Sequence, residues 1–245
     1  YDINSDFDLN VVDVIELINL ILDGESLIFG CMDIEACNYS SFAQASDDSC
    51  IYRPYFDDGP LEYHCGDIIF LTELAQYNNI PIPFNDVSNL GAQNWDPSFL
   101  GQNAILRLSS LSIFDSNIFY IPASIRHLDR IETLILYGNQ IEILPQGIGD
   151  LVNLKFLHLY DNQISILPDE IIGLESLEIL YLSYNNINTI PNNICNLSES
   201  CMIDLDYNKL CNEFNFECFD DFYPQDQTDC CESENGISNW TNCED

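Results

Sequence analysis

The first thirteen residues place oxygen-bearing side chains at alternating positions. They occupy positions one, three, five, seven, nine and twelve of a loop that begins at Asp2. A calcium ion takes six to eight hard oxygen ligands, and a loop with this spacing can supply them. The candidate ligands are Asp2, Asn4, Asp6, Asp8, Asn10 and Asp13. The sequence therefore predicts a Ca²⁺ site here; the alternative is a solvated acidic turn that caps an ordinary helix.

A helix is predicted directly after this loop, because apolar residues recur there at helical spacing. Val14, Leu17, Ile18 and Ile21 lie on one face of that helix. Full burial of an aliphatic side chain is worth about 1.5–3 kcal/mol, so a bare stripe is unfavourable. We therefore predict that this docking helix is covered by this chain, by a separate protein or by the next copy of the same protein.

The loop and its helix together resemble one half of a dockerin, the calcium-loop module that docks onto cohesins. The resemblance implies side-chain ligation by Asp2, Asn4, Asp6 and Asp13, carbonyl ligation by Asp8, and ligation by Asn10 directly or through water. Two departures stand out. Phe7 occupies the turn position where glycine is usual, which strains the loop, and only one of a dockerin's two segments is present.

The stretch from Leu108 to Leu210 repeats the same pattern several times. Prolines recur every 23 residues, at Pro122, Pro145, Pro168 and Pro191, and asparagines keep the same step at Asn139, Asn162, Asn185 and Asn208. Within each unit, alternate residues such as Leu134 and Leu136 point inward on a short strand. A fixed period of this size predicts a solenoid, because one unit cannot bury its apolar face without neighbours.

These units resemble leucine-rich repeats of the variety N-x-I-x-x-L-P-x-x-I-x-x-L. The resemblance implies an α/β solenoid, a right-handed coil with short parallel strands on its concave face. Each asparagine is expected to bond backbone groups that the turn leaves bare. Ser116 stands where the first asparagine belongs, which marks a weaker edge repeat. Ile141, Leu144, Ile148 and Leu151 are expected to fill the interior of one turn.

Aromatic residues dominate the outward positions of the predicted concave strands. These candidate partner-binding residues are Phe114, Tyr137, Phe156, His158, Tyr160, Tyr181, Tyr184 and Tyr207. Tyrosine rings with interleaved carboxylates make a good contact surface, although stacked rings can also merely stabilise neighbouring strands. The histidines His64, His127 and His158 lie in no nucleophile or metal motif, so we do not expect an enzyme.

Eleven cysteines in 245 residues indicate an oxidising compartment. Residues 27–54 resemble a short Cys-rich acidic repeat of secreted bacterial proteins. This segment has three cysteines, Cys31, Cys37 and Cys50, and Cys65 could supply a fourth to make their number even. The acidic cluster of this segment could hold a second, weaker calcium ion. At the other end, we expect Cys195 and Cys201 to pair with each other or with Cys211 and Cys218, as in disulfide-stapled caps of extracellular leucine-rich repeats.

The net charge of −35 at pH 7 repels nucleic acid and anionic membrane, so we do not expect either as a partner. Solubility in a salty medium explains such a charge, as does binding of cations or of a basic partner. No apolar run is long enough to span a membrane. We interpret the chain as a processed piece of a secreted protein with sequons at Asn38, Asn196 and Asn239.

Five segments follow from these patterns: a calcium loop and helix (1–26), a Cys-rich acidic linker (27–54), an N-terminal cap (55–103) with Trp95 as its plug, leucine-rich repeats (104–210) and a Cys-rich C-terminal cap and tail (211–245). Two functions remain open. The first is extracellular self-assembly or surface scaffolding through the N-terminal calcium segment. The second is adhesion or recognition, in which the concave face binds a protein or a glycan.

Overall fold

The computed structural model describes residues 29–33, 36–40, 43, 45–46, 49–51, 62–81, 90–100, 103–197 and 201–210. The chain divides into two compact units. One consists of Tyr1–Leu108 with Pro122–Leu128, and the other of Ser109–Ile121 with Asp129–Asp245. Within the described ranges, no helix is both long enough and apolar enough to cross a membrane.

Two disulfides organise the cysteine-rich part of the first unit. The short strands β1 (Phe29–Gly30) and β2 (Ala45–Ser46) pair in parallel. Disulfides join Cys31 to Cys50 and Cys37 to Cys65. The expectation that Cys65 evens out the three cysteines of this segment is therefore confirmed.

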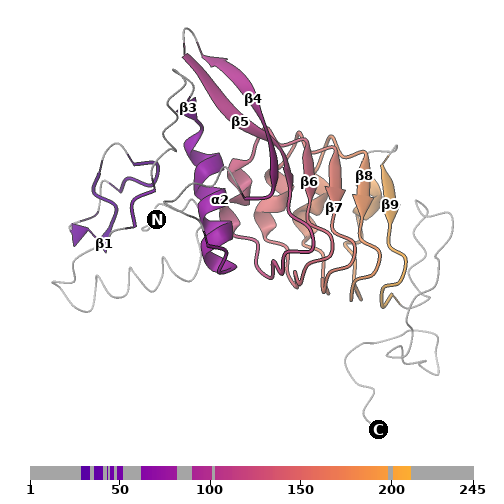
Figure 1. Cartoon of the computed structure of the whole chain (residues 1–245). Helices are drawn as coiled ribbons and strands as arrows, with labels where there is room; N and C mark the ends of the chain where they lie inside the picture. Colours follow the sequence, from indigo (N-terminus) through magenta and orange to yellow (C-terminus); the bar gives the residue numbers. More distant parts are fainter. Residues whose placement is uncertain are drawn as a thin grey trace, which may run out of the picture. The chain divides into compact units, whose positions relative to one another are not determined.

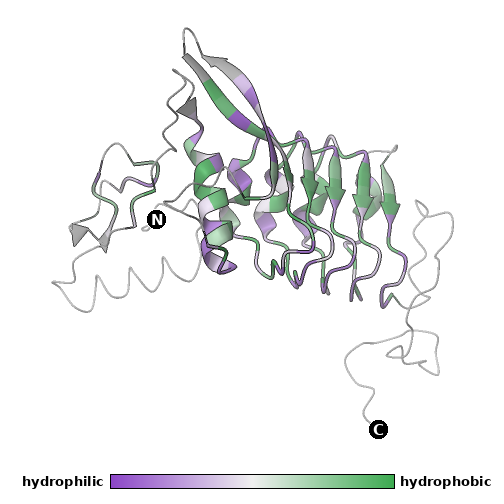
Figure 2. Ribbon diagram, in the orientation of Figure 1, coloured by the Kyte–Doolittle hydropathy of each residue, from purple (hydrophilic) through white to green (hydrophobic). Residues whose placement is uncertain are grey.

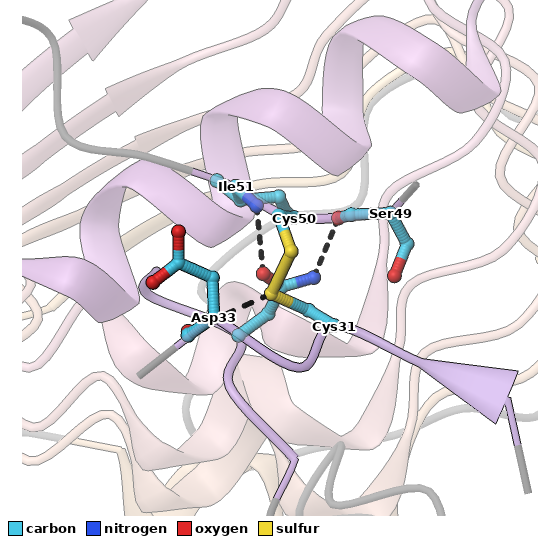
Figure 3. The surroundings of a disulfide bond; sticks show 6 residues. Cys31, Asp33, Ser49, Cys50 and Ile51 are labelled. Carbon is cyan, nitrogen blue, oxygen red and sulfur yellow. Dashed lines mark hydrogen bonds between the residues drawn. A yellow bond between two sulfur atoms is a disulfide. The ribbon is translucent and has the colours of Figure 1, made fainter. Parts of the chain in front are cut away.

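The side chain of Asn38 holds the chain beside the Cys31–Cys50 bond. Its Nδ2 donates a hydrogen bond of 2.7 Å to Ser49 O, and its Oδ1 accepts one of 2.7 Å from Ile51 N. Figure 3 shows these bonds next to the disulfide, with Ser49 and Ile51 on either side of Cys50. One side-chain amide thus bonds to the backbone groups on both sides of Cys50. These bonds help to stabilise a segment that is too short to build a hydrophobic core of its own.

A helix and a hairpin make up the rest of the first unit. Strand β3 (Glu62–Tyr63) precedes helix α2 (Cys65–Tyr77), which has Asn78 as its C-cap. Strands β4 (Ala92–Leu100) and β5 (Asn103–Ser112) pair as a long hairpin that the sequence did not predict (Figure 1). Trp95 of β4 packs edge-on against Tyr63, with ring centroids 4.5 Å apart.

A buried ion pair fixes α2 to β5 within this unit. Asp67, on the first turn of α2, is completely buried. Its carboxylate accepts hydrogen bonds from Arg107 Nε at 3.1 Å, Arg107 Nη2 at 3.2 Å and Leu108 N at 2.8 Å. Arg107 also donates to the carbonyl of His127 in the 3₁₀ helix η3 (Ala123–His127). The carboxylate thus has partners for both oxygens, which a buried charge requires.

The second unit is a coil in which each turn adds one short strand to a parallel sheet. The end of β5 pairs with β6 (Thr133–Ile135), followed by β7 (Phe156–His158), β8 (Ile179–Tyr181) and β9 (Met202–Asp204). Leu134 lies opposite Leu157, and Leu157 lies opposite Leu180. The 23-residue sequence step therefore sets the register of the strands, which Figure 1 shows side by side.

The interior of this coil is aliphatic from turn to turn. Ile141, Ile148 and Leu151 are completely buried, and Leu144 is 3% exposed, so the predicted inward positions are confirmed. In Figure 2 the strands β6 to β9 are largely green, the colour of hydrophobic residues. The parallel strands and this continuous core confirm the predicted α/β solenoid.

The return segments opposite the strands contain short 3₁₀ helices. These are η4 (Gln146–Asp150), η5 (Asp169–Gly173) and η6 (Ile194–Asn196). Pro145 and Pro168 precede η4 and η5 in an extended conformation, and their carbonyls accept hydrogen bonds from Ile148 N and Ile171 N. Proline suits this position because its restricted φ fits the extended cap and its missing N–H leaves no unpaired donor.

The repeated asparagines join each turn to the preceding one. Asn162 Oδ1 accepts a hydrogen bond of 3.0 Å from Ile141 N, and its Nδ2 donates to Leu136 O at 2.9 Å and Leu159 O at 3.1 Å. Asn139, Asn185 and Asn208 make the corresponding contacts in their own turns. The predicted role of these asparagines is confirmed, and we call these bonds between successive turns the asparagine ladder.

The cysteines near the end of the solenoid differ from the expectation. Cys195 is disulfide-bonded, whereas Cys201 has a free thiol. The expected bond between these two residues is therefore wrong, and so is the role of Cys201 as a disulfide residue. Burial raises the pKa of the Cys201 thiol to about 11, which keeps it protonated near neutral pH and slows its reactions. Cys211 and Cys218 lie outside the described residues.

Candidate functional site

The predicted calcium loop and docking helix lie outside the described residues. This applies to the ligands Asp2, Asn4, Asp6, Asp8, Asn10 and Asp13 and to the helix residues Val14, Leu17, Ile18 and Ile21. Among the residues that the structure describes, no group of three or more His, Cys, Asp or Glu side chains is placed to hold a metal ion. Calcium binding by the N-terminal loop therefore stays a prediction.

The predicted partner-binding residues all lie on the outward side of the solenoid strands or in the turn that follows each strand. We call this surface the strand face. It consists of Phe114, Asp115, Thr133, Ile135, Tyr137, Gly138, Phe156, His158, Tyr160, Asp161, Ile179, Tyr181, Ser183, Tyr184, Met202, Asp204, Asp206 and Tyr207. Large apolar groups on it remain accessible, and Tyr184 and Phe114 are 55% and 47% exposed.

The aromatic residues of the strand face form three groups. Phe114, Tyr137 and Tyr160 make one continuous stack, with centroids 4.9 Å and 4.5 Å apart and planes within 8°. Tyr184 and Tyr207 make a second stack at 4.4 Å. His158 packs at a tilt against Tyr181, with centroids 4.8 Å apart. Phe156 lies in register with Ile179.

The turn after each strand has a left-handed backbone conformation. Asp115, Gly138, Asp161, Tyr184 and Tyr207 occupy this position in successive turns, with φ between 51° and 65°. Glycine and aspartate tolerate this conformation, but it is uncommon for a bulky residue. Tyr184 and Tyr207 therefore carry a local conformational cost that the residues of the earlier turns avoid.

The charge of the strand face is negative. Asp115, Asp161, Asp204 and Asp206 contribute carboxylates, and none of its residues is lysine or arginine. Burial, and then the nearby charge of Asp204, raises the pKa of Asp206 above its usual value. Burial lowers the pKa of His158, which keeps the imidazole neutral near pH 7. The face thus combines apolar rings with carboxylates that lack a cation on the same surface.

Lys155, at the border of the strand face, already has an acidic partner. Lys155 Nζ lies 2.8 Å from Glu132 Oε2, and both side chains are exposed. The hydrogen bond to Glu132 raises the pKa of Lys155. Lys155 therefore does not neutralise the carboxylates of the strand face.

A second exposed apolar group lies in the return segments, and sequence reasoning missed it. Ile143 forms a parallel bridge to Ile166, which bridges to Thr189. Ile143 is 72% exposed, Ile166 60% and Tyr120, one repeat earlier, 45%. We call Tyr120, Ile143, Ile166 and Thr189 the side column. The 23-residue step aligns these residues, so the signal was present in the sequence.

Comparison with known proteins agrees with this geometry. A leucine-rich-repeat family model matches residues 153–174 and 176–197. The leucine-rich-repeat ectodomain of the receptor kinase SOBIR1 of Arabidopsis thaliana aligns with a TM-score of 0.53 at 22% identity, over 61% of this chain and 83% of that one. No curated protein matches the chain.

Two further solved structures are similar over shorter stretches. A leucine-rich-repeat protein of Leptospira interrogans is 36% identical, with a TM-score of 0.41, over 42% of this chain and 26% of its own length. This chain therefore spans about a quarter of that protein. A plant ice-binding protein is 26% identical, with a TM-score of 0.39, over 42% of this chain and 35% of its own. Together with the parallel register and the asparagine ladder, the family match identifies the repeat region as a leucine-rich-repeat solenoid.

Proposed function

We propose that this chain is an extracellular recognition module that binds a protein partner through the strand face. The observation that carries the proposal is the pair of exposed ring stacks, Phe114–Tyr137–Tyr160 and Tyr184–Tyr207. Aromatic residues, tyrosine above all, are enriched where proteins bind one another. Rings held by their neighbours lose little rotamer freedom on binding, so they contribute more of their contact energy to affinity.

The left-handed turns support a binding role over a purely structural one. The same turn position accepts Asp115 and Gly138 elsewhere in the solenoid, so the fold does not require tyrosine there. Tyr184 and Tyr207 nevertheless place large rings on the surface despite a disfavoured backbone conformation. Conformational strain of this kind is concentrated at functional sites.

The disulfides and the predicted calcium loop complete the proposal. Disulfides such as Cys31–Cys50 and Cys37–Cys65 persist in oxidising compartments, which supports an extracellular location. In this proposal the N-terminal loop binds Ca²⁺ through Asp2, Asn4, Asp6 and Asp13, and its helix tethers the module to a second protein. The protein acts by association and does not catalyse a reaction.

Self-assembly is a second candidate, and the side column favours it. Ile143 and Ile166 expose aliphatic surface in neighbouring turns. The stripe of the predicted docking helix, Val14, Leu17, Ile18 and Ile21, has the apolar chemistry that would cover such a column on a second copy. Particle mass with excess Ca²⁺ and with a chelator tests this candidate. Growth with calcium that Ile166→Ser abolishes would support it, and a constant monomer mass would exclude it.

Selection from a displayed library of short random peptides tests the main proposal. Peptides are selected on the full chain and then tested against two variants, Tyr137→Ser/Tyr184→Ser on the strand face and Ile143→Ser/Ile166→Ser on the side column. We expect the strand-face variant to lose most selected peptides and the side-column variant to keep them. Retention of the peptides by the strand-face variant would contradict the proposal. Both variants are first shown to melt cooperatively like the wild type.

A further inference from the structure

One ring stack of the strand face ends abruptly. Phe114, Tyr137 and Tyr160 follow one another at the 23-residue step, and the next residue at that step is Ser183, which is followed by Asp206. The backbone confirms the alignment, because Asp161 N donates to Ser183 O at 3.0 Å and Tyr184 N donates to Asp206 O at 2.9 Å. The ring of Tyr160 therefore has an aromatic neighbour, Tyr137, on one face, and a small side chain follows it on the other.

The spacing of the strands sets the room beyond Tyr160. Neighbouring parallel strands lie about 4.8 Å apart, so Tyr160 and Asp206, two turns apart, are separated by about 10 Å at the backbone. The intervening Ser183 is small and only 7% exposed, so it can form only the floor of this space, and Tyr181 and Tyr184 flank it along its own turn. A flat group placed over Ser183 would have a ring face on one side and a carboxylate on the other.

We propose that Tyr160, Ser183 and Asp206 form a subsite for an arginine side chain of the protein partner. This inference rests on the proposed function, since it names the chemistry that the strand face recognises. The guanidinium is planar, stacks on aromatic faces and donates N–H groups in its plane to carboxylates. It can therefore stack on Tyr160 over Ser183 while an N–H at its edge donates to Asp206.

The electrostatics of the strand face agree with a cationic ligand. Asp115 and Asp161 lie beside the same stack, Asp204 lies beside Asp206, and no lysine or arginine stands among the residues of the face. Burial and the nearby charge of Asp204 disfavour the ionised form of Asp206 and so raise its pKa. A bound guanidinium would stabilise the ionised carboxylate. The net charge of −35 also attracts basic partners and accelerates their encounter.

The choice between arginine and other ligands follows from shape and charge. An uncharged sugar could lie against the Tyr160 ring, but it would leave the Asp206 carboxylate without a cation. An ammonium group carries the charge but is compact and strongly hydrated, so it uses the ring face less well than a planar guanidinium does. The subsite combines a ring face with a carboxylate, and an arginine side chain can bind both.

A titration with defined peptides tests the subsite in the full chain. The probe is a short glycine peptide with one central arginine, and its control carries citrulline, which has nearly the same shape without the charge. Binding is followed by NMR through the ring signals of Tyr160. We expect saturable shifts with the arginine peptide and at least tenfold weaker binding of the citrulline peptide. Equal binding of the two peptides would overturn the inference.

Matched variants distinguish binding at the subsite from general attraction of the cationic peptide to the negatively charged protein. Asp206→Asn and Asp150→Asn remove one carboxylate each, but Asp150 is exposed in η4, away from the strand face. We expect Asp206→Asn to weaken binding of the arginine peptide about tenfold and Asp150→Asn less than twofold. Tyr160→Phe should retain binding and Tyr160→Leu should lose it, because the ring face is required. Equal effects of the two acid variants would show only general attraction and would overturn the subsite.

The same variants distinguish failure of the subsite from failure of the proposed function. If selected peptides lose binding to Tyr137→Ser/Tyr184→Ser but bind Asp206→Asn normally, the strand face binds partners and the arginine subsite is wrong. If they bind Tyr137→Ser/Tyr184→Ser normally, the proposed function itself is wrong.

Discussion

Tyr137 and Tyr160 stack face to face, with their ring centroids 4.5 Å apart and their planes within 8° of parallel. This distance is close to the spacing of neighbouring β-strands, so the register of β6 and β7 is sufficient to bring the rings together. The two hydroxyls interact as well. Burial, and then the charge and the hydrogen bond of Tyr137, raise the pKa of Tyr160. The solenoid thus presents a preordered aromatic surface without a dedicated loop.

The asparagine ladder should be the most sensitive polar element of the solenoid. Asn162→Ala removes the acceptor for Ile141 N and the donor for the carbonyls of Leu136 and Leu159. Each buried group left without a partner costs about 1–3 kcal/mol, so we expect a loss of roughly 2–5 kcal/mol in the free energy of unfolding. Urea denaturation measures it. The exposed neighbour Gln163→Ala is the control, and an equally small effect of both changes would contradict the proposed role of the ladder.

The buried pair in the first unit leads to a second stability prediction. Asp67→Asn leaves the Arg107 guanidinium buried without its counter-charge, and breaking a buried ion pair in this way costs about 3–5 kcal/mol. The exposed Lys155–Glu132 pair is the control, because Glu132→Gln should leave the stability nearly unchanged. Thermal melting compares the two variants. A stable Asp67→Asn protein would show that the pair does not hold α2 to β5.

His158 predicts a pH dependence with a definite sign. Burial lowers its pKa in the folded protein below the usual value of about 6.5. The unfolded chain therefore takes up a proton first as the pH falls, and stability is lost from about pH 6.5 downward, through the pKa of the folded state. The difference in melting temperature between His158→Phe and the wild type should be constant above about pH 7 and should shift in favour of the variant below pH 6. A shift in favour of the wild type at low pH would refute this assignment.

The cysteines should differ sharply in their reaction with iodoacetamide. Cys31, Cys37, Cys50 and Cys65 are disulfide-bonded and should react only after reduction. Cys201 should react without reduction but slowly at pH 8, because a thiol with a pKa of about 11 holds only about a thousandth of its population as thiolate. Peptide mapping by mass spectrometry gives the result. Protection of Cys201 until reduction would mean that it is bonded after all.

Local regularity decided how much could be predicted from the sequence. The period of the prolines and asparagines predicted the solenoid, and the alternation around Leu134 placed the aromatic residues on one face. The Asp67–Arg107 pair could not be predicted, because its partners lie 40 residues apart and belong to no repeat. The β4–β5 hairpin was missed because Pro97 within β4 argues against a strand. Cys201 was misassigned because spacing alone does not determine which cysteines pair.

Calorimetry of one selected peptide against three proteins shows whether partners bind the strand face. The proteins are the wild type, Tyr137→Ser/Tyr184→Ser and Ile143→Ser/Ile166→Ser, all shown to be folded. If partners bind the strand face, we expect the strand-face variant to raise the Kd at least tenfold, the loss expected when central aromatic contacts are removed. The side-column variant should leave the Kd within about twofold. An unchanged Kd for the strand-face variant together with lost binding by the side-column variant would contradict binding at the strand face.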